Sequence, residues 1–133
     1  MTETSGGKLI LIVEDNEKNL KLARDVLRFS GFQTLEAGTG EAAVDLARER
    51  RPDLILMDIE LPGIDGITAL QQLRANAGTA DIPIVALTAS AMSSDRERFY
   101  SAGFDGYISK PINIIEFPGQ VRAHCERRMR EQP

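Results

Sequence analysis

Carboxylates follow two of the most apolar segments of this chain, at the points where those segments end. Glu14 and Asp15 follow the run Leu9–Val13, and Asp58 follows the run Leu54–Met57. Clustered carboxylates that lose water repel one another, so such a group needs a compensating charge. A hard divalent cation such as Mg2+ takes oxygen ligands and supplies that charge, and Mn2+ accepts similar ligands. The pattern therefore predicts a metal site beside a nucleophilic aspartate.

Two further polar residues close apolar runs later in the chain. Thr88 follows Ile84–Leu87, and Lys110 follows Gly106–Ser109. Because parallel strands present their carboxyl ends at one edge of a sheet, we expect the carboxylates, the hydroxyl and the ammonium to converge there. A carboxylate can attack phosphorus while a metal, a lysine and a hydroxyl contact the phosphoryl oxygens. No Walker-type loop or dinucleotide fingerprint occurs, which disfavours a nucleotide substrate.

The elements that must position these residues alternate between strand and helix. Strands are predicted over residues 8–13, 33–37, 54–58, 84–87 and 106–109, and helices over 17–30, 41–50, 66–76, 94–102 and about 113–129. This alternation implies crossover connections, a parallel sheet and helices on both of its faces, which is an α/β fold. The strand over 33–37 is more polar than the others, so we expect it at an edge. Asn16 can cap the helix over 17–30.

The last predicted helix contains a local conflict. Asn113 and Glu116 have the spacing of a capping pair, but Pro118 and Gly119 follow within the second turn. A proline there removes a helical hydrogen bond and clashes with the preceding turn. We expect either a kink near Pro118, or a single early turn with the regular helix restarting at Phe117 or Pro118.

Length and composition indicate one ordinary domain. The chain has 133 residues, of which 42% are hydrophobic and 27% charged, and its net charge is −4. That charge gives no overall footprint for nucleic acid, so we expect no nucleic-acid partner. The basic residues near the end are interrupted by acids, and we interpret them as the solvated face of the last helix; they are Arg122, Arg127, Arg128 and Arg130.

Cysteine usage and the lengths of apolar runs bear on the compartment. Cys125 is the only cysteine, which excludes an intrachain disulfide and a multi-cysteine zinc site. We expect it to be an inert packing or surface thiol, and we expect no metal or phosphoryl role for His124. The start of the chain lacks the features of a signal peptide, and no apolar run approaches a membrane span. We therefore predict a cytoplasmic protein with no membrane partner.

Four blocks of sequence together resemble the receiver domain of two-component response regulators. They are Val13–Asn16, Met57–Gly63, Leu87–Ala89 and Ser109–Pro111, and they occur in the order of that family. The resemblance covers about residues 8–124. It implies a flavodoxin-like three-layer α/β/α sandwich with five helices and a parallel sheet in the order 2-1-3-4-5. We expect a receiver domain over residues 8–129, with flexible termini at 1–7 and 130–133.

The resemblance also implies how the metal and the phosphoryl group are held. Asp58 would be the phosphoacceptor in an Mg2+-dependent reaction. Asp15 and Asp58 would bind Mg2+ through their side chains, and the backbone carbonyl of Glu60 would be a third ligand. Glu14 would act mainly through metal-bound water. The protein would not be a metabolic enzyme. It would catalyse its own phosphorylation and slow autodephosphorylation.

A second set of roles implied by the resemblance concerns the switch. Lys110 would contact the phosphoryl group, and Thr88 would move toward it after phosphorylation. Tyr107 would be the aromatic residue whose rotamer follows Thr88. Pro111 would follow a cis peptide bond that holds Lys110 in place.

Where many receivers have two aspartates after the first strand, this chain has Glu14 and Asp15. This form is similar to the receivers of hybrid kinases and to small single-domain regulators of the DivK type, and the start at Met1 favours a stand-alone regulator. The donor would be a sensor histidine kinase or a histidine phosphotransfer protein. Output would be contact with a downstream protein through helix 4, strand 5 and helix 5, roughly Ser94–Met129, from a monomer or weak dimer.

Three other functions fit parts of the pattern. An Mg2+-dependent aspartate-nucleophile phosphatase shares the aspartate-bearing parallel sheet, but Asp58-Ile59-Glu60 lacks its second aspartate and there is no cap domain. An unphosphorylated receiver-like interaction module would keep the fold without the chemistry, although the intact set of site residues argues against it. A flavin-binding protein could share the fold, but the acidic loop after the first strand disfavours phosphate binding.

Overall fold

The computed structural model describes residues 7–59, 61, 63–89 and 93–131, with backbone only for 93, 94 and 127–131. Strand and helix alternate throughout, as the sequence predicts. The elements are β1 (Leu9–Val13), α1 (Glu17–Phe29), β2 (Gln33–Ala37), α2 (Gly40–Arg50), β3 (Leu54–Asp58), α3 (Gly66–Ala75), β4 (Ile84–Thr88), α4 (Ser93–Ala102), β5 (Gly106–Ser109) and α5 (Phe117–Glu131).

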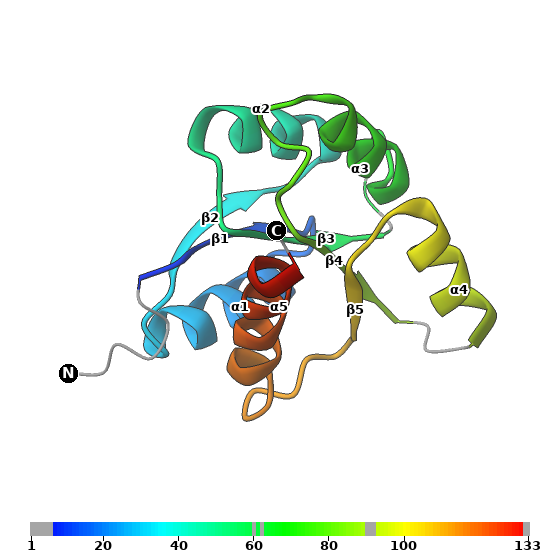
Figure 1. Ribbon diagram of the computed structural model, residues 1–133. Helices are drawn as coiled ribbons and strands as arrows, with labels where there is room; N and C mark the ends of the chain where they lie inside the picture. The colour runs from blue at the N-terminus through cyan, green and yellow to red at the C-terminus, as the bar shows by residue number, and fades with distance from the viewer. Residues whose placement is uncertain (1–6, 60, 62, 90–92, 132–133) are drawn as a thin grey trace.

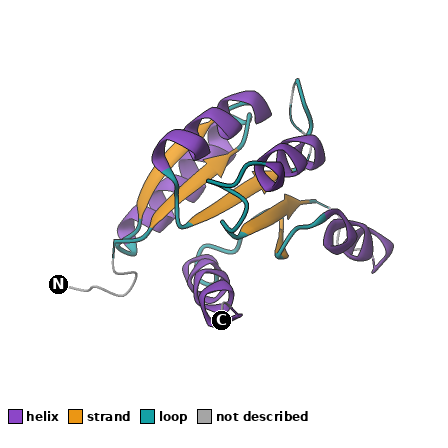
Figure 2. Ribbon diagram, turned by 45° about the horizontal axis from the view of Figure 1, so that its top comes forward, coloured by secondary structure: helices purple, strands orange, loops and turns teal. Residues whose placement is uncertain are grey.

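The five strands form one parallel sheet in the order β2-β1-β3-β4-β5, which confirms the predicted order and the edge position of β2. Helices cover both faces of this sheet, with α2 and α3 on one side and α1 and α5 on the other (Figures 1 and 2). The predicted flavodoxin-like three-layer α/β/α arrangement is therefore confirmed.

The register of the sheet brings the carboxyl ends of four strands to the same end of the sheet. Val13 pairs with Met57, so the residues that follow β1 lie beside Asp58 at the end of β3. Asp58 in turn pairs with Leu87, and Thr88 pairs with Ser109. The last residues of β3 and β4, and the residues just after β1 and β5, therefore lie at the same end of the sheet, and they are the polar residues that we expected to converge.

Two apolar layers hold the sheet between its helices. Alternate residues of β1 point to opposite faces, so Leu11 packs in the layer under α2, α3 and α4, while Ile10 packs in the layer under α1 and α5. Both faces of β1, β3 and β4 are covered, and those strands are almost wholly apolar for that reason. Among the described residues, the buried polar side chains are Glu14, Asp58 and Thr88 at the strand ends and Thr79 in the loop after α3.

Side-chain caps set the starts of α1, α2 and α3. Asn16 caps α1 as predicted, since its side chain accepts a hydrogen bond from the Asn19 N–H at 3.0 Å. Thr39 caps α2 in the same way, so this helix begins one residue before the predicted start. Asp65 caps α3 and accepts a hydrogen bond from the Thr68 N–H at 2.8 Å, which holds the pKa of Asp65 below its usual value.

The last helix restarts at Phe117, which is one of the two predicted arrangements. Asn113 forms an early turn, because its carbonyl accepts the Phe117 N–H at 2.8 Å and its side chain accepts the N–H groups of Ile115 and Glu116. Pro118 then lies in the first turn of α5, where a missing N–H removes no helical hydrogen bond. The proline therefore fits without breaking the helix.

The single cysteine of the chain lies on α5. Cys125 is buried in the layer under α1 and α5, and burial raises the pKa of its thiol to about 11. It is a packing thiol, in line with the first of the two predicted placements.

The helix runs to Glu131, beyond the predicted end near residue 129. Residues 1–6, 132 and 133 of the predicted flexible termini lie outside the described residues.

Candidate functional site

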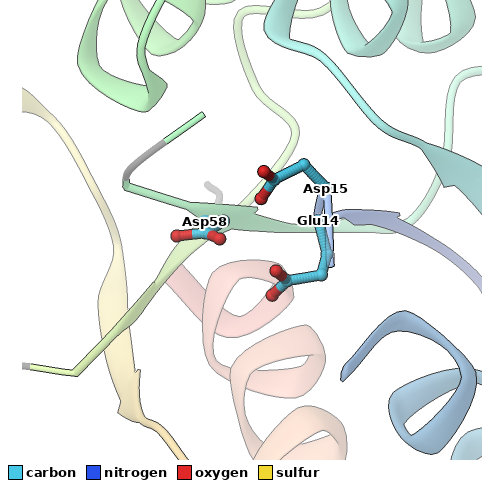
Figure 3. A group of neighbouring side chains, drawn as sticks. All are labelled: Glu14, Asp15 and Asp58. Atoms are coloured by element: carbon cyan, nitrogen blue, oxygen red, sulfur yellow. The ribbon is translucent and has the colours of Figure 1, made fainter. Parts of the chain in front are cut away.

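Three carboxylates converge where β1 and β3 end (Figure 3). Glu14, Asp15 and Asp58 each offer an oxygen, and these oxygens lie within 4.8 Å of one another. Glu14 and Asp58 are only 3% and 4% exposed, whereas Asp15 is exposed. The polar residues at the strand ends predicted this grouping. The structure adds that two of the carboxylates are buried and the third is at the surface.

Lys110 contributes the positive charge of the site. Its Nζ lies 3.1 Å from Asp58 Oδ2 and 3.2 Å from Glu14 Oε1. The Lys110 backbone N–H donates to the Thr88 carbonyl at 2.8 Å, which fixes the start of the side chain at the end of β5. The peptide bond between Lys110 and Pro111 is cis, in agreement with the expectation from the sequence.

The charges of this cluster do not balance. The pKa of Glu14 is raised, first because burial removes water from the carboxylate and second because Asp58 is negatively charged. Burial would lower the pKa of Lys110, but the hydrogen bond and charge of Asp58, followed by those of Glu14, outweigh it and leave that pKa raised. One ammonium therefore faces several carboxylates, and the all-oxygen donor set fits a hard cation such as Mg2+ or Mn2+.

Replacing Glu14 with glutamine should stabilise the metal-free protein at pH 7 but not at low pH. Because the pKa of Glu14 is raised on folding, its contribution to stability is complete below its ordinary value of 4.5 and is lost as the pH rises through the folded value. We expect Glu14→Gln to raise the free energy of unfolding at pH 7 by about 1 kcal/mol.

Urea unfolding with a chelator present, at pH 7 and at pH 4.5, measures this effect. Glu49→Gln is the matched control, because Glu49 is exposed on α2. An equal change at both pH values would contradict the assignment, since the glutamine would then act through packing rather than through charge.

Thr88 and Tyr107 lie on β4 and β5, the two strands that follow β3 in the sheet. Thr88 is buried, at 6% exposed, and ends the strand next to that of Asp58. Tyr107 is half-buried on β5, where the guanidinium carbon of Arg96 lies 5.2 Å from its ring centroid. Tyr107 therefore contacts α4, and β4 lies between its strand and that of Asp58. Glu60, the expected carbonyl ligand, lies outside the described residues.

A cavity of about 350 Å³ opens beside the phosphoacceptor candidate. Asp58, Thr88 and Lys110 line it from the sheet edge, and Asp95, Arg98 and Phe99 line it from α4. No motif in the sequence had marked these α4 residues. The helix is polar around most of its circumference, so its sequence gives little indication of which charged side chains face the sheet edge.

Gly66, which the sequence analysis also passed over, sets the approach of α3 to Asp58. A Cβ on this residue would lie 2.7 Å from the Asp58 carbonyl oxygen. The Gly66 N–H donates to the Ile59 carbonyl at 3.2 Å and closes the loop after β3. Only glycine allows the start of α3 to pass this close to the backbone of β3. The signal was the glycine at the predicted helix start.

Comparison with known proteins agrees with this geometry. Residues 10–122 match the family described as the response regulator receiver domain. The chain belongs to this family. Within the described residues, no helix of this receiver domain is long and apolar enough to cross a membrane.

Individual relatives and solved structures support the assignment. The polar-differentiation response regulator DivK of Brucella anthropi is 45% identical over 117 residues, which cover 88% of this chain and 95% of the relative. The receiver domain of sensor histidine kinase PA1611 from Pseudomonas aeruginosa, with a magnesium ion coordinated in its active site cleft, is 37% identical with a TM-score of 0.83, over 90% of this chain and 98% of that one.

A second solved structure extends the comparison to manganese. The Mn2+-bound form of the response regulator Rcp1 is 30% identical with a TM-score of 0.72, over 87% of this chain and 90% of that one. The metals belong to those proteins. The carboxylates of the present receiver domain form a cluster that is compatible with the same ions.

Proposed function

We propose that this response regulator accepts a phosphoryl group on Asp58 from a phosphohistidine protein, in an Mg2+-dependent reaction, and signals by phosphorylation-dependent protein contact. The observation that carries the proposal is the environment of Asp58. Its carboxylate is buried, lies 3.1 Å from the Lys110 ammonium, groups with two other carboxylates and opens onto a cavity. A buried carboxylate with this access is suited to nucleophilic attack on phosphorus.

Each residue of the site has a distinct part in the transfer. An oxygen of Asp58 attacks phosphorus, the bond from phosphorus to the donor imidazole nitrogen breaks, and its electron pair leaves with the imidazole. Asp15 and Asp58, together with Glu14 through water and the Glu60 carbonyl, would hold Mg2+, which would supply positive charge to the phosphoryl oxygens. Lys110 exchanges its ion pair with Asp58 for one with a phosphoryl oxygen. Because the cavity also admits water, slow hydrolysis of the acyl phosphate returns Asp58 to its carboxylate.

The output of the switch would arise at α4, β5 and α5. Thr88 would donate its hydroxyl to the phosphoryl group, and Tyr107 would turn toward the space that Thr88 leaves. The contact of Arg96 with the Tyr107 ring supports this route, because it links β5 to α4. Such a switch requires only a modest shift between two states. A downstream protein would bind this face.

The donor and setting follow from the same proposal. The donor would be a sensor histidine kinase or a histidine phosphotransfer protein, and residues 8–129 would act as one receiver domain in a monomer or weak dimer. The single, buried cysteine agrees with a cytoplasmic protein that needs no disulfide.

Phosphorylation by a small donor tests the proposed reaction. Incubation with acetyl phosphate and Mg2+ should increase the intact mass by one phosphoryl group, and Mn2+ should replace Mg2+. A chelator should prevent the gain, because the carboxylate cluster then repels the dianionic donor. Equal gain with the chelator would contradict the metal requirement, and no gain with either metal would contradict the function.

A further inference from the structure

The cavity beside Asp58 extends to a part of α4 that the proposed reaction does not use. Asp95, Arg98 and Phe99 form that side of it. Its volume of about 350 Å³ compares with roughly 30 Å³ for one water in the liquid, so it has room for a phosphoryl group and its leaving group. Glu14 and Asp15 are absent from the described residues that line it. The cavity therefore lies on a different side of Asp58 from Glu14 and Asp15.

Arg98 places a second positive charge at this cavity. Its side chain is exposed, and its guanidinium carbon lies 5.4 Å from the ring centroid of Phe99, which is buried beneath it. The charge of Arg98 also adds to the hydrogen bonds from Thr68 that lower the pKa of Asp65, the cap of α3. The guanidinium is thus close enough to the start of α3 to act across the space between α4 and α3.

The two cations of the cavity have different surroundings. Lys110 forms ion pairs with Glu14 and Asp58, so these carboxylates already compensate its charge before a donor arrives. Arg98 is exposed at the α4 side, where an incoming anion would meet it first. Asp95 lies in the first turn of α4, where the helix dipole favours an acid, and it lines the same cavity, so its charge opposes that of Arg98.

We propose that Arg98 is a donor-binding residue, whose guanidinium attracts and orients the anionic phosphoryl group of the donor as it enters the cavity. The proposal rests on the proposed function of Asp58. A dianionic donor must approach a carboxylate cluster on a chain with a net charge of −4, and a cation at the entrance offsets that repulsion. The planar fork of arginine can form paired hydrogen bonds with phosphoryl oxygens.

The phosphoryl group is the feature that large and small donors share. It is attached to nitrogen in a phosphohistidine protein or in phosphoramidate, and to oxygen in acetyl phosphate. With acetyl phosphate, the new bond forms between phosphorus and Asp58, the bond to the bridging oxygen breaks, and acetate leaves with its electron pair. Arg98 gives up no proton and forms no bond. Its effect should therefore appear in donor capture for both kinds of leaving group.

Kinetics of phosphorylation by acetyl phosphate and by phosphoramidate, with Mg2+ present, test this role in the full chain. Arg98→Gln should lower the second-order rate constant about fivefold at low salt, and the difference should shrink at high salt. The maximal rate at saturating donor and the autodephosphorylation rate should stay close to wild type. Arg98→Lys, which keeps the charge but not the planar fork, should recover part of the loss.

Arg48→Gln is the matched control, because Arg48 is exposed on α2 and its loss changes the net charge equally. The inference is overturned if Arg98→Gln and Arg48→Gln behave alike, if the loss is confined to one donor, or if autodephosphorylation changes as much as capture. Those outcomes leave the proposed function standing, whereas failure of the wild-type chain to be phosphorylated would overturn both. Thermal unfolding should be unchanged in Arg98→Gln, since the side chain is exposed.

Discussion

Replacing Asp58 with asparagine should abolish phosphorylation and, at the same time, stabilise the metal-free protein. The amide keeps the shape of the side chain but is a far poorer nucleophile than the carboxylate. The substitution also removes a buried charge that raises the pKa of Glu14, so this pKa should fall toward its ordinary value. Glu14 and Lys110 would then remain as a simple ion pair. We expect the free energy of unfolding at pH 7 to rise by about 1 kcal/mol.

Intact mass after incubation with acetyl phosphate and Mg2+, and urea unfolding with a chelator, measure the two effects of Asp58→Asn. Asp45→Asn is a suitable control because Asp45 is exposed on α2 and the net charge changes equally. A phosphoryl gain that persists in Asp58→Asn would assign the acceptor elsewhere. A fall in stability would show that attraction to Lys110 outweighs repulsion among the carboxylates.

Replacing Lys110 with glutamine should reduce phosphorylation and should change stability in the opposite direction. Lys110 is positioned to contact the transferred group, and loss of one such contact lowers a rate by about a hundredfold. It is also the cation within ion-pair distance of both Glu14 and Asp58 in the described structure. Its removal leaves two buried carboxylates together, so we expect the free energy of unfolding to fall by about 2 kcal/mol.

Lys110→Arg separates the two effects of this residue. A guanidinium keeps the positive charge and should preserve most of the stability, but its planar shape differs from an ammonium and should not restore the full rate. Added Mg2+ should recover part of the stability of Lys110→Gln, because a bound cation compensates the same carboxylates. Wild-type phosphorylation in Lys110→Gln would contradict the role of Lys110, and unchanged stability would contradict the charge argument.

The parts of the fold that the sequence predicted depend on local features of the chain. Strands covered on both faces must be apolar, so β1, β3 and β4 stood out as uninterrupted runs, and the polar residues at their ends marked the site. The cap of α1 at Asn16 followed from its side-chain chemistry. The restart of α5 was left between two alternatives, because the choice depends on the turn that Asn113 forms.

Other features of the site depend on how elements pack in space. The polar sequence of α4 has little apolar periodicity, so nothing in it indicated that Asp95 and Arg98 line the cavity beside Asp58. The reach of the Lys110 side chain to Glu14 depends on where β5 lies relative to β1, with two strands between them. The close approach of Gly66 to Asp58 likewise needs the course of the loop after β3.

The most direct test of the account is to locate the phosphoryl group on the chain. Borohydride reduces an aspartyl phosphate to homoserine, so treatment of the phosphorylated protein followed by peptide mass spectrometry identifies the acceptor. The account predicts homoserine at position 58 in the sample that received both Mg2+ and acetyl phosphate, and none in the sample with a chelator. Homoserine at position 15 or at any other aspartate, with Asp58 intact, would contradict it.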